Sequence, residues 1–412
     1  MIPDRQGRRR RLWVISELYA PEETSTGYVL TRIAEALAED FEVGVLCGQP
    51  TYSARGTRAP VRELRNGVRV RRCAGTTLDK NRLWGRLINF ATAGTSMFVN
   101  ALRKIRRHDV VLVVTNPPLL PFLTVLAARI RGAHSVLLVH DVYPDVMVAT
   151  GMIRAGSIWE RLGSRLNGWL YRTVDRVIVL GRDMAILAQR KMARATWHRI
   201  EVIPNWADTD SIVPEPKSSN ALLHELGTGD AFVVQYAGNM GRPNDLDVLV
   251  EAATRLRADA SVRLVLLGSG ARRRRLELDV RERGLGNVVL LPPRPRSEQQ
   301  LFLNACDVAV VSLVRGMMGI GVPSRLYNIL AAGRPVIVIS EAESEAALVV
   351  REIDAGWVVA PGDVDGLLAV IGAARRDPDR LREMGARARR AAEDRFSFDK
   401  VIADYRRVLR AV

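Results

Sequence analysis

Cysteines are scarce in this sequence, and no apolar run resembles a secretory signal. Its 412 residues include three cysteines, Cys47, Cys73 and Cys306, which lie far apart. An odd, sparse set of this kind forms neither a disulfide framework nor a metal or redox pair, so we expect a reduced, cytoplasmic protein. The apolar run at 12–15, behind the basic cluster at 8–11, is too short for the core of a signal peptide.

Long uncharged stretches are also rare, and only one needs a membrane test. Residues 110–128 carry no charge and are about long enough to cross a bilayer. Pro117 and Pro118 lie in the middle of this stretch and would break the hydrogen bonds of a helix. A buried strand at 110–114, a proline loop and an amphipathic helix fit the sequence better than a membrane span.

Two nucleotide-binding signatures are missing. No glycine loop completes the GxGxxG pattern or the P-loop, which argues against a dinucleotide oxidoreductase and an NTPase. Asp-x-Asp occurs four times, and so scattered a set is typical of chance. We assign no metal and expect none; the four copies lie at 208–210, 245–247, 363–365 and 377–379.

Positive charge is abundant and unevenly distributed. The chain has 61 Lys+Arg and 45 Asp+Glu, a net charge of +16. Residues 1–207 hold 32 basic and 17 acidic residues (+15), whereas 208–412 hold 29 and 28 (+1). The first half is therefore expected to meet an anionic partner: nucleic acid, a membrane surface or a phosphorylated substrate.

Short apolar, β-branched runs alternate with helical patterns along the chain. Near-continuous apolar strands separated by helices predict parallel sheets covered on both faces, and the pattern restarts once. We expect an α/β protein with two doubly wound, Rossmann-like domains. The predicted boundaries are an N-terminal domain at 1–207, a linker at 208–229, a C-terminal domain at 230–396, and a final helix at 397–412 that packs back on the first domain.

Two glycine loops follow predicted strands of the second domain. The first contains Gly238, Asn239, Gly241 and Arg242. The second contains Gly268 and Gly270. Glycines let backbone amides approach a phosphate, and Arg242 adds a positive charge. The alternative is that both are tight strand-to-helix turns, which need glycine without any ligand.

The segment 323–335 suggests a ligand-binding helix start. Pro323 suits a first helical turn, and Ser324 places a hydroxyl there. Arg325 can pair with a phosphate through two nitrogens. Asn328 lies about one turn further along the same face, where it can hydrogen-bond a sugar hydroxyl. The alternative is a capped helix with a solvated arginine.

In the first domain, His140 and Asp141 end a predicted strand at 135–139, where the catalytic groups of such sheets are expected. A histidine can exchange a proton near neutral pH, although a lone histidine is often structural. Gly27 begins the helix that follows the first strand and would let it approach a ligand closely.

The segment 78–107 combines apolar and aromatic residues with basic flanks, as an interfacial helix on anionic lipid does. An ordinary surface helix with its apolar face on the core is the alternative. A second tryptophan-bearing stretch at 157–172 is expected to extend this surface. The residues predicted to meet the membrane or acceptor are Trp84, Arg82, Arg86, Arg103 and Lys104.

A series of short sequence motifs, in order across nearly the whole chain, resembles the sequence of a GT-B glycosyltransferase of family 4. The resemblance is closest to the bacterial branch that builds exopolysaccharide, O-antigen and colanic acid. The landmarks are VISELYAPEETSTGY at 14–28, NPP at 116–118, HDVYPD at 140–145, IPNWAD at 203–208, QYAGNMGR at 235–242, LVLLGSGA at 264–271, ACDVAVVSL at 305–313 and PSRLYNILAAGRPVIVI at 323–339.

The sequence departs from that family at one signature. Two glutamates separated by seven residues usually contact the donor sugar and the ribose. Here the corresponding positions are Ile320 and Asn328. Arg325 stands where this branch commonly has the lysine of Pro-Ser-Lys. The resemblance thus leaves ribose recognition to Asn328 and no glutamate for the donor sugar.

The resemblance implies a retaining, metal-independent glycosyltransferase of cell-surface polysaccharide biosynthesis. The second domain would hold a nucleotide-sugar, with a UDP-sugar as the expected donor. A lipid-linked, polyprenyl-diphosphate saccharide would be the acceptor. His140 and Asp141 would position the reactants in an interdomain cleft, and the enzyme would sit peripherally on the inner face of the plasma membrane. The alternatives are a GT-B sugar-nucleotide epimerase and a non-enzymatic protein that binds membranes or nucleic acid, the latter lacking an RNA-binding aromatic pattern.

Overall fold

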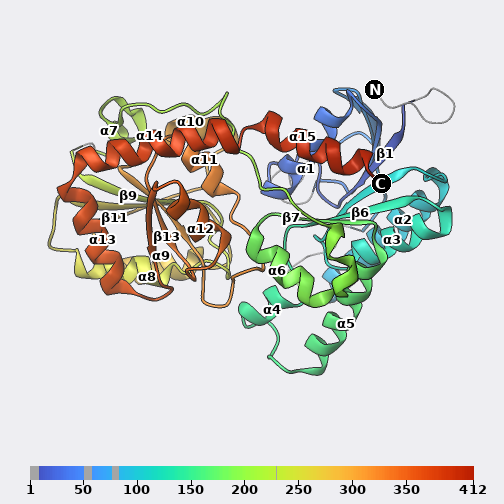
Figure 1. The fold of residues 1–412 in the computed structure, drawn as a ribbon. Helices are drawn as coiled ribbons and strands as arrows, with labels where there is room; N and C mark the ends of the chain where they lie inside the picture. The colour runs from blue at the N-terminus through green and yellow to red at the C-terminus, as the bar shows by residue number, and fades with distance from the viewer. Residues whose placement is uncertain (1–8, 51–57, 77–82, 229) are drawn as a thin grey trace. The chain divides into compact units, whose positions relative to one another are not determined.

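The computed structural model describes residues 9–50, 58–76, 83–228 and 230–412, and the chain divides into two compact units (Figure 1). The first unit comprises the chain up to Pro144 together with Gly156–Ile203 and Ile402–Val412. The second comprises Asp145–Ala155 and Pro204–Val401. Each unit is built around one sheet, as the alternating sequence pattern predicted.

The first unit contains an eight-stranded sheet in the order β3-β4-β2-β1-β5-β6-β7-β8. All neighbouring strands are parallel except β3, which runs antiparallel to β4. The strand order reverses between β1 and β5, and ligands of such sheets bind beyond the strand ends at that point. The strands are β1 (Arg11–Ile15), β2 (Glu42–Cys47), β3 (Arg62–Arg65), β4 (Val68–Arg72), β5 (Val110–Val114), β6 (His134–Val139), β7 (Arg176–Val179) and β8 (Ile200–Val202).

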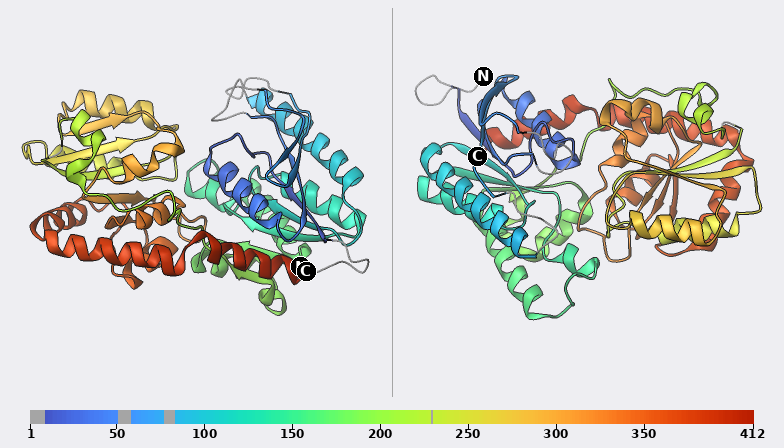
Figure 2. Two further views of the ribbon diagram at one scale, coloured as in Figure 1. Left: turned by 90° about the horizontal axis from the view of Figure 1, so that it is seen from above. Right: turned by 180° about the vertical axis from the view of Figure 1, so that it is seen from behind.

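Helices lie on both faces of this sheet (Figure 2). Every residue of β5 is buried, because a parallel sheet covered on two sides has no solvent face. The predicted strand at 110–114, proline loop and helix are confirmed, and no helix in the described part of the chain is long and apolar enough to span a membrane. The helices are α1 (Ser25–Leu37), α2 (Leu83–Lys104), α3 (Leu120–Arg131), α5 (Ile158–Thr173) and α6 (Arg182–Lys191).

The second unit contains a six-stranded, fully parallel sheet in the order β11-β10-β9-β12-β13-β14. Its order reverses between β9 and β12, so the loops after these two strands flank the expected ligand position. The strands are β9 (Phe232–Ala237), β10 (Val262–Leu267), β11 (Val288–Leu291), β12 (Val308–Ser312), β13 (Val336–Ile339) and β14 (Gly356–Val359).

The helices of the second unit follow its strands, except for short ones near its start. They are α4 (Asp145–Ala149), α7 (Ala221–Glu225), α8 (Asp247–Arg255), α9 (Arg273–Glu282), α10 (Gln299–Leu303), α11 (Arg325–Ala331), α12 (Glu345–Glu352), α13 (Val364–Arg376) and α14 (Pro378–Arg395). A last helix, α15 (Phe398–Arg410), ends in the first unit, which includes Ile402–Val412. There Tyr405, Val408 and Leu409 are buried, and Arg406 pairs with Asp40 at 2.6 Å.

The described part of the predicted linker at 208–229 belongs to the second unit and packs against it. Ile212 is buried, and Arg389 of α14 donates to the carbonyl oxygens of Ile212 (2.6 Å) and Thr209 (3.1 Å). Leu222 and Leu223 of α7 are buried too. The polar, proline-containing composition suggested a linker, and its few apolar residues are enough to dock the segment on the second unit.

Candidate functional site

The two glycine loops of the second unit pack directly against each other. Gly238 donates its N–H to the carbonyl of Leu267 (2.9 Å), and Met240 donates to that of Ser269 (2.7 Å). A Cβ atom on Gly268 would lie 1.9 Å from the Gly238 oxygen, and the φ of Gly268 is +146°. Contact between the loops therefore requires glycine here, which favours the tight-turn interpretation for the second loop.

Arg325 begins α11 and lies over the end of β9. Its guanidinium is centred 4.6 Å from the middle of the Tyr236 ring, and its Nη2 donates to Asn244 Oδ1 at 2.5 Å. A Cβ on Gly238 would lie 2.7 Å from Nη1, so only glycine lets the guanidinium approach this closely. Nη1 is buried and has no hydrogen-bond partner among the described residues. The result is a fixed cation with an unused donor at the reversal of strand order.

Asn244, which sequence reasoning missed, organises this region. It is buried, and its Nδ2 donates to the Asn239 carbonyl at 2.9 Å. The hydroxyl of Tyr236 donates to the same oxygen at 2.6 Å. Arg272 Nη1 donates to the Asn244 carbonyl at 2.9 Å. No motif contained Asn244, and the landmark at 235–242 contained Tyr236 without indicating this role, because the role depends on which loops meet in space.

The other residues predicted for the donor site are only partly gathered here. Gly241 is buried and the Asn239 side chain is exposed in the same loop as Gly238. Arg242 is exposed. Pro323 and Ser324 precede α11, and the Ser324 side chain does not cap this helix. The structure thus brings Gly238, Asn239, Arg325 and the second loop together but leaves Arg242 at the surface.

Asn328 has partners inside the second unit. Its Oδ1 accepts from the backbone N–H of Asp208 at 3.0 Å, and its Nδ2 donates to Gln299 Oε1 at 3.3 Å. The side chain is buried. Both ends of the amide thus hold α11 to neighbouring segments, and the ribose contact stays a prediction that these bonds do not favour.

Glu341 is a second residue that the sequence did not single out. It follows β13, and its Oε1 accepts a hydrogen bond from the Gly316 N–H. Its Oε2 is buried and has no hydrogen-bond partner in the described part of the chain. The loop of Gly316 also joins the loop after β9, since Val314 N–H donates to the Pro243 oxygen at 2.9 Å. An unsatisfied carboxylate oxygen therefore lies at the same sheet edge as Arg325.

In the first unit, His140 and Asp141 lie at the end of β6, as predicted. Their backbone N–H groups both donate to the hydroxyl of Thr115, at 3.1 and 3.3 Å. Thr115 follows β5, so the reversal of strand order is next to this turn. His140 Nδ1 is 3.3 Å from the hydroxyl of Thr26 in α1, and Nε2 is buried with no partner among the described residues.

Burial shifts the titration of both side chains. It lowers the pKa of His140 to about 4, because the charged imidazolium is poorly solvated. It raises the pKa of Asp141 to about 6 for the same reason. At neutral pH the histidine is uncharged and the aspartate mostly ionised. Shifts of this size are concentrated at functional sites, which supports the sequence prediction.

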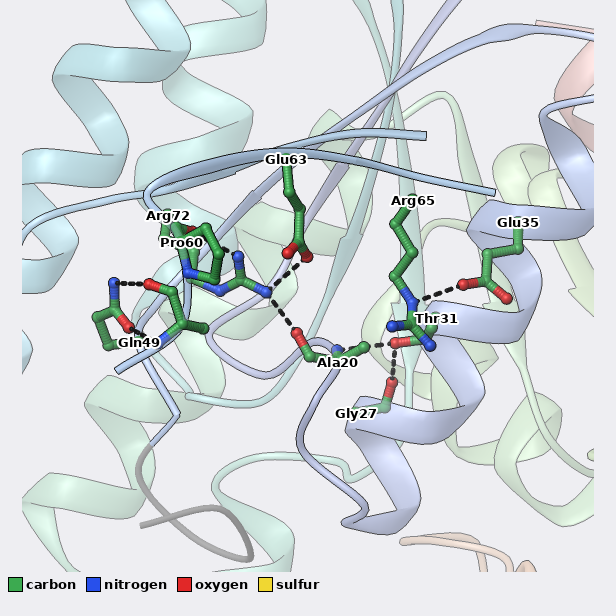
Figure 3. Close-up of polar contacts among 10 residues, drawn as sticks. Ala20, Gly27, Thr31, Glu35, Gln49, Pro60, Glu63, Arg65 and Arg72 are labelled. Carbon is green, nitrogen blue, oxygen red and sulfur yellow. Dashed lines mark hydrogen bonds and ion pairs between the residues drawn. The ribbon is translucent and has the colours of Figure 1, made fainter. Parts of the chain in front are cut away.

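The start of α1 is held in place by a buried arginine (Figure 3). Arg72 Nη2 donates to the Ala20 carbonyl at 2.6 Å and to Glu63 Oε1 at 2.9 Å. Ala20 N–H donates to the Thr31 hydroxyl, which in turn donates to the Gly27 carbonyl at 2.7 Å. A Cβ on Gly27 would lie 2.8 Å from the Glu22 oxygen. Gly27 is therefore needed for loop packing, and this packing positions Thr26 beside His140.

The residues predicted to face a membrane are distributed along α2. Trp84 is exposed near its start, and Arg103 and Lys104 are exposed at its end. Arg82 lies outside the described residues, as does the side chain of Arg86. Other residues of α2 are buried, among them Met97 and Ala101, so this helix also has the ordinary amphipathic packing that was the alternative.

Comparisons with known proteins agree with the two-unit architecture. Residues 26–206 match the family described as glycosyl transferase 4-like domain, and 231–377 match glycosyl transferases group 1. The probable glycosyltransferase WbjE of Pseudomonas aeruginosa is 30% identical over 361 residues, 88% of each chain. The putative colanic acid biosynthesis glycosyl transferase WcaI of Escherichia coli K12 is 26% identical over 366 residues, covering 86% of this chain and 89% of WcaI.

Solved structures share the fold. Sucrose-phosphate synthase from Thermosynechococcus elongatus has a TM-score of 0.78 at 19% identity, covering 98% of this chain and all (100%) of that one. HepE from Anabaena, solved with UDP and glucose, has a TM-score of 0.74 at 15% identity with the same coverage. Both family matches, and an identity of 30% across most of the chain, lead to one conclusion: the chain belongs to family 4 of the GT-B glycosyltransferases.

Proposed function

We propose that this glycosyltransferase moves a sugar from a UDP-sugar to a lipid-linked saccharide in cell-surface polysaccharide biosynthesis, with retention of configuration and without a metal. The observation that carries the proposal is the fixed guanidinium of Arg325, with its unused Nη1 donor beside Gly238. The name of WcaI, a putative colanic acid biosynthesis enzyme, supports the polysaccharide context.

The diphosphate of the donor is proposed to meet Arg325. A guanidinium in a partly buried site stabilises a departing diphosphate by direct charge and hydrogen bonding, and so takes over the role that a divalent cation has elsewhere. Tyr236 and Asn244 hold the group in place, so little entropy is lost when the ligand binds. The HepE structures with UDP and with UDP-glucose support the choice of a UDP-sugar as donor.

Glu341 is proposed to accept a hydrogen bond from a hydroxyl of the donor sugar. Its buried Oε2 lacks a donor, and leaving such an oxygen unsatisfied is costly. β13 is two strands away from β9, a separation of about 10 Å. That distance suits a sugar attached to a diphosphate held by Arg325. The carboxylate of Glu341 would thus supply the contact to the donor sugar that Ile320, which stands in place of the usual glutamate, cannot make.

The first unit is proposed to serve the acceptor. Neutral His140 can accept or donate a hydrogen bond without forming an ion pair with the diphosphate. Ionised Asp141 can orient a hydroxyl of the acceptor by accepting a hydrogen bond from it. The net charge of +15 on residues 1–207 suits a polyprenyl-diphosphate acceptor and the anionic inner face of the plasma membrane. Trp84, Arg103 and Lys104 are proposed to contribute to that association.

A donor panel assayed with the purified protein tests the proposal. UDP-, GDP- and dTDP-sugars are offered with and without a polyprenyl-diphosphate saccharide, and the released nucleoside diphosphate is measured. We expect the release of nucleoside diphosphate to depend on the acceptor and to be fastest with UDP-sugars. NMR of the product should show the same anomeric configuration as the donor sugar. Sugar interconversion without acceptor would instead identify an epimerase, and the absence of any donor binding would refute the proposed function.

A further inference from the structure

Helix α5 exposes an unusual amount of apolar surface. Ile158 and Trp159 are 74% and 69% exposed, and Leu162, Leu166 and Trp169 are exposed as well. Ile158, Leu162, Leu166 and Trp169 follow one another at intervals of four, four and three residues, which places them along one side of a helix. Contiguous apolar patches of this kind on a folded protein mark binding surfaces.

The exposure does not come from a poorly packed helix. The Ser157 hydroxyl caps the start of α5 by accepting from the Glu160 N–H at 3.3 Å. Tyr171, on the other side of the helix, and Leu170, at the edge of the apolar stripe, are both buried in the first unit. The helix therefore has a complete core-facing side, and its second apolar side faces outward.

Helix α3 continues the same surface. The Phe122 ring stacks on Trp169, with centroids 6.2 Å apart and an interplanar angle of 17°. Leu126 and Ile130 lie four and eight residues after Phe122, on the same side of α3, and both are exposed. We call these two residues, with the five exposed apolar residues of α5, the α3–α5 face.

Unpaired basic residues border this face. Arg161, Arg165 and Arg172 are spaced four and seven residues apart, along the side of α5 next to its apolar stripe, and all are exposed. Arg129 is exposed at the end of α3. None of the four forms a salt bridge with any acidic residue that the structure describes. The only carboxylate on α5, Glu160, already accepts from the Gly156 N–H.

We propose that the α3–α5 face inserts into the headgroup region of an anionic lipid bilayer. The apolar side chains supply the buried area, the two tryptophans prefer the interfacial depth, and the arginines meet lipid phosphates. At 16 residues α5 is too short to cross the membrane and suits a position in its surface. The proposal rests on the membrane association in the proposed function, but moves its main contact from α2 to α3 and α5.

Vesicle binding tests this without donor or acceptor. Full-length protein is sedimented with vesicles of phosphatidylcholine alone or with 30% phosphatidylglycerol, at about 0.1 M salt. We expect the combined variant Ile158→Ser, Trp159→Ser, Leu162→Ser to bind the mixed vesicles at least about tenfold more weakly. Arg161→Gln with Arg165→Gln should lose most of the preference for the anionic lipid. Leu278→Ser, at an exposed leucine of α9, is the matched control and should bind as wild type.

The other outcomes are distinguishable. Undiminished vesicle binding by the triple variant, or loss caused by Trp84→Ser instead, would overturn the proposal. A wild-type dimer by light scattering that the triple variant abolishes would show that the face pairs with a second copy. UDP binding by each variant is measured in parallel: wild type that binds anionic vesicles but no nucleotide would refute the proposed function and leave this inference standing.

Discussion

At the scale of single residues, a guanidinium stacked on Tyr236 and held by Asn244 cannot swing away from the loop after β9. The sequence predicted a phosphate contact for Arg325 from its place at a helix start. It did not identify the ring or the amide that fix it, because those contacts join segments about 80 and 90 residues apart in the chain. The proposed phosphate contact therefore depends on the orientation of the guanidinium as much as on its charge.

Removing this charge is the first prediction. Arg325→Ala should weaken UDP binding by about 2 kcal/mol, or about thirtyfold, as expected for a lost hydrogen bond to a charged group. Arg325→Lys keeps the charge but cannot stack a planar group on the ring, so its affinity for UDP should lie between those of wild type and Arg325→Ala. Calorimetric titration with UDP measures both. An unchanged affinity in Arg325→Ala would exclude the assigned role.

The second prediction separates sugar recognition from nucleotide recognition. Glu341→Gln should bind UDP as wild type does, because UDP has no sugar beyond the diphosphate. Its affinity for the UDP-sugar that the donor panel selects should fall by about 1 kcal/mol or more, because the amide is a weaker acceptor than a carboxylate. Equal losses for both ligands would indicate a structural role for Glu341 instead.

The third prediction uses pH. His140 binds its proton with a pKa of about 4 in the fold, against 6.5 when unfolded, so protonation of the unfolded chain lowers stability as the pH falls through this window. Asp141 has a folded pKa of about 6 against 3.8, so stability falls as pH rises between these values. The two effects oppose each other in wild type.

Single variants should expose them. Relative to wild type, His140→Gln should gain stability as the pH falls from 7 to 4. Relative to wild type, Asp141→Asn should gain stability as the pH rises from 4 to 7. Urea unfolding at several pH values gives both slopes. Parallel slopes in the two variants would contradict the burial of these groups.

At the scale of elements, several outcomes depended on neighbours that the local pattern does not show. The strands β3 and β4 escaped the sequence prediction because their alternating arginines look like a polar surface segment. Asn66 and Gly67 join them, both with positive φ as a tight hairpin turn requires. Charged residues are normal on such an edge strand, since they discourage pairing with another chain.

The glycine loops make a prediction at this scale. Gly268→Ala forces a Cβ into the Gly238 carbonyl, so we expect a loss of about 2–4 kcal/mol in unfolding free energy together with weaker UDP binding. Gly286→Ala is the matched control, because nothing lies within 4 Å of its Cβ position. Thermal denaturation compares the two. Equal melting temperatures would show that the loops can separate at little cost.

At the scale of the whole molecule, the chain returns to its first unit at the end. Leu409 and Val408 are buried there, and Arg410 pairs with Asp40 at 2.5 Å. Leu409→Ala should therefore destabilise the first unit by about 2–4 kcal/mol. Arg407→Ala, which removes an exposed ion pair with Glu201, should cost less than about 1 kcal/mol. Urea unfolding of the full chain measures the difference.

The sequence by itself determined the α/β class, the two repeats of the strand–helix pattern, the family, and the places of Arg325, His140 and Asp141, because periodicity and short motifs are local properties of a chain. Only the tertiary structure decided which groups lack partners. Asn328 is tied to Asp208, Glu341 keeps an unsatisfied oxygen, and α5 shows an apolar side to solvent. Exposure and hydrogen bonding depend on residues distant in sequence, so no local pattern can report them.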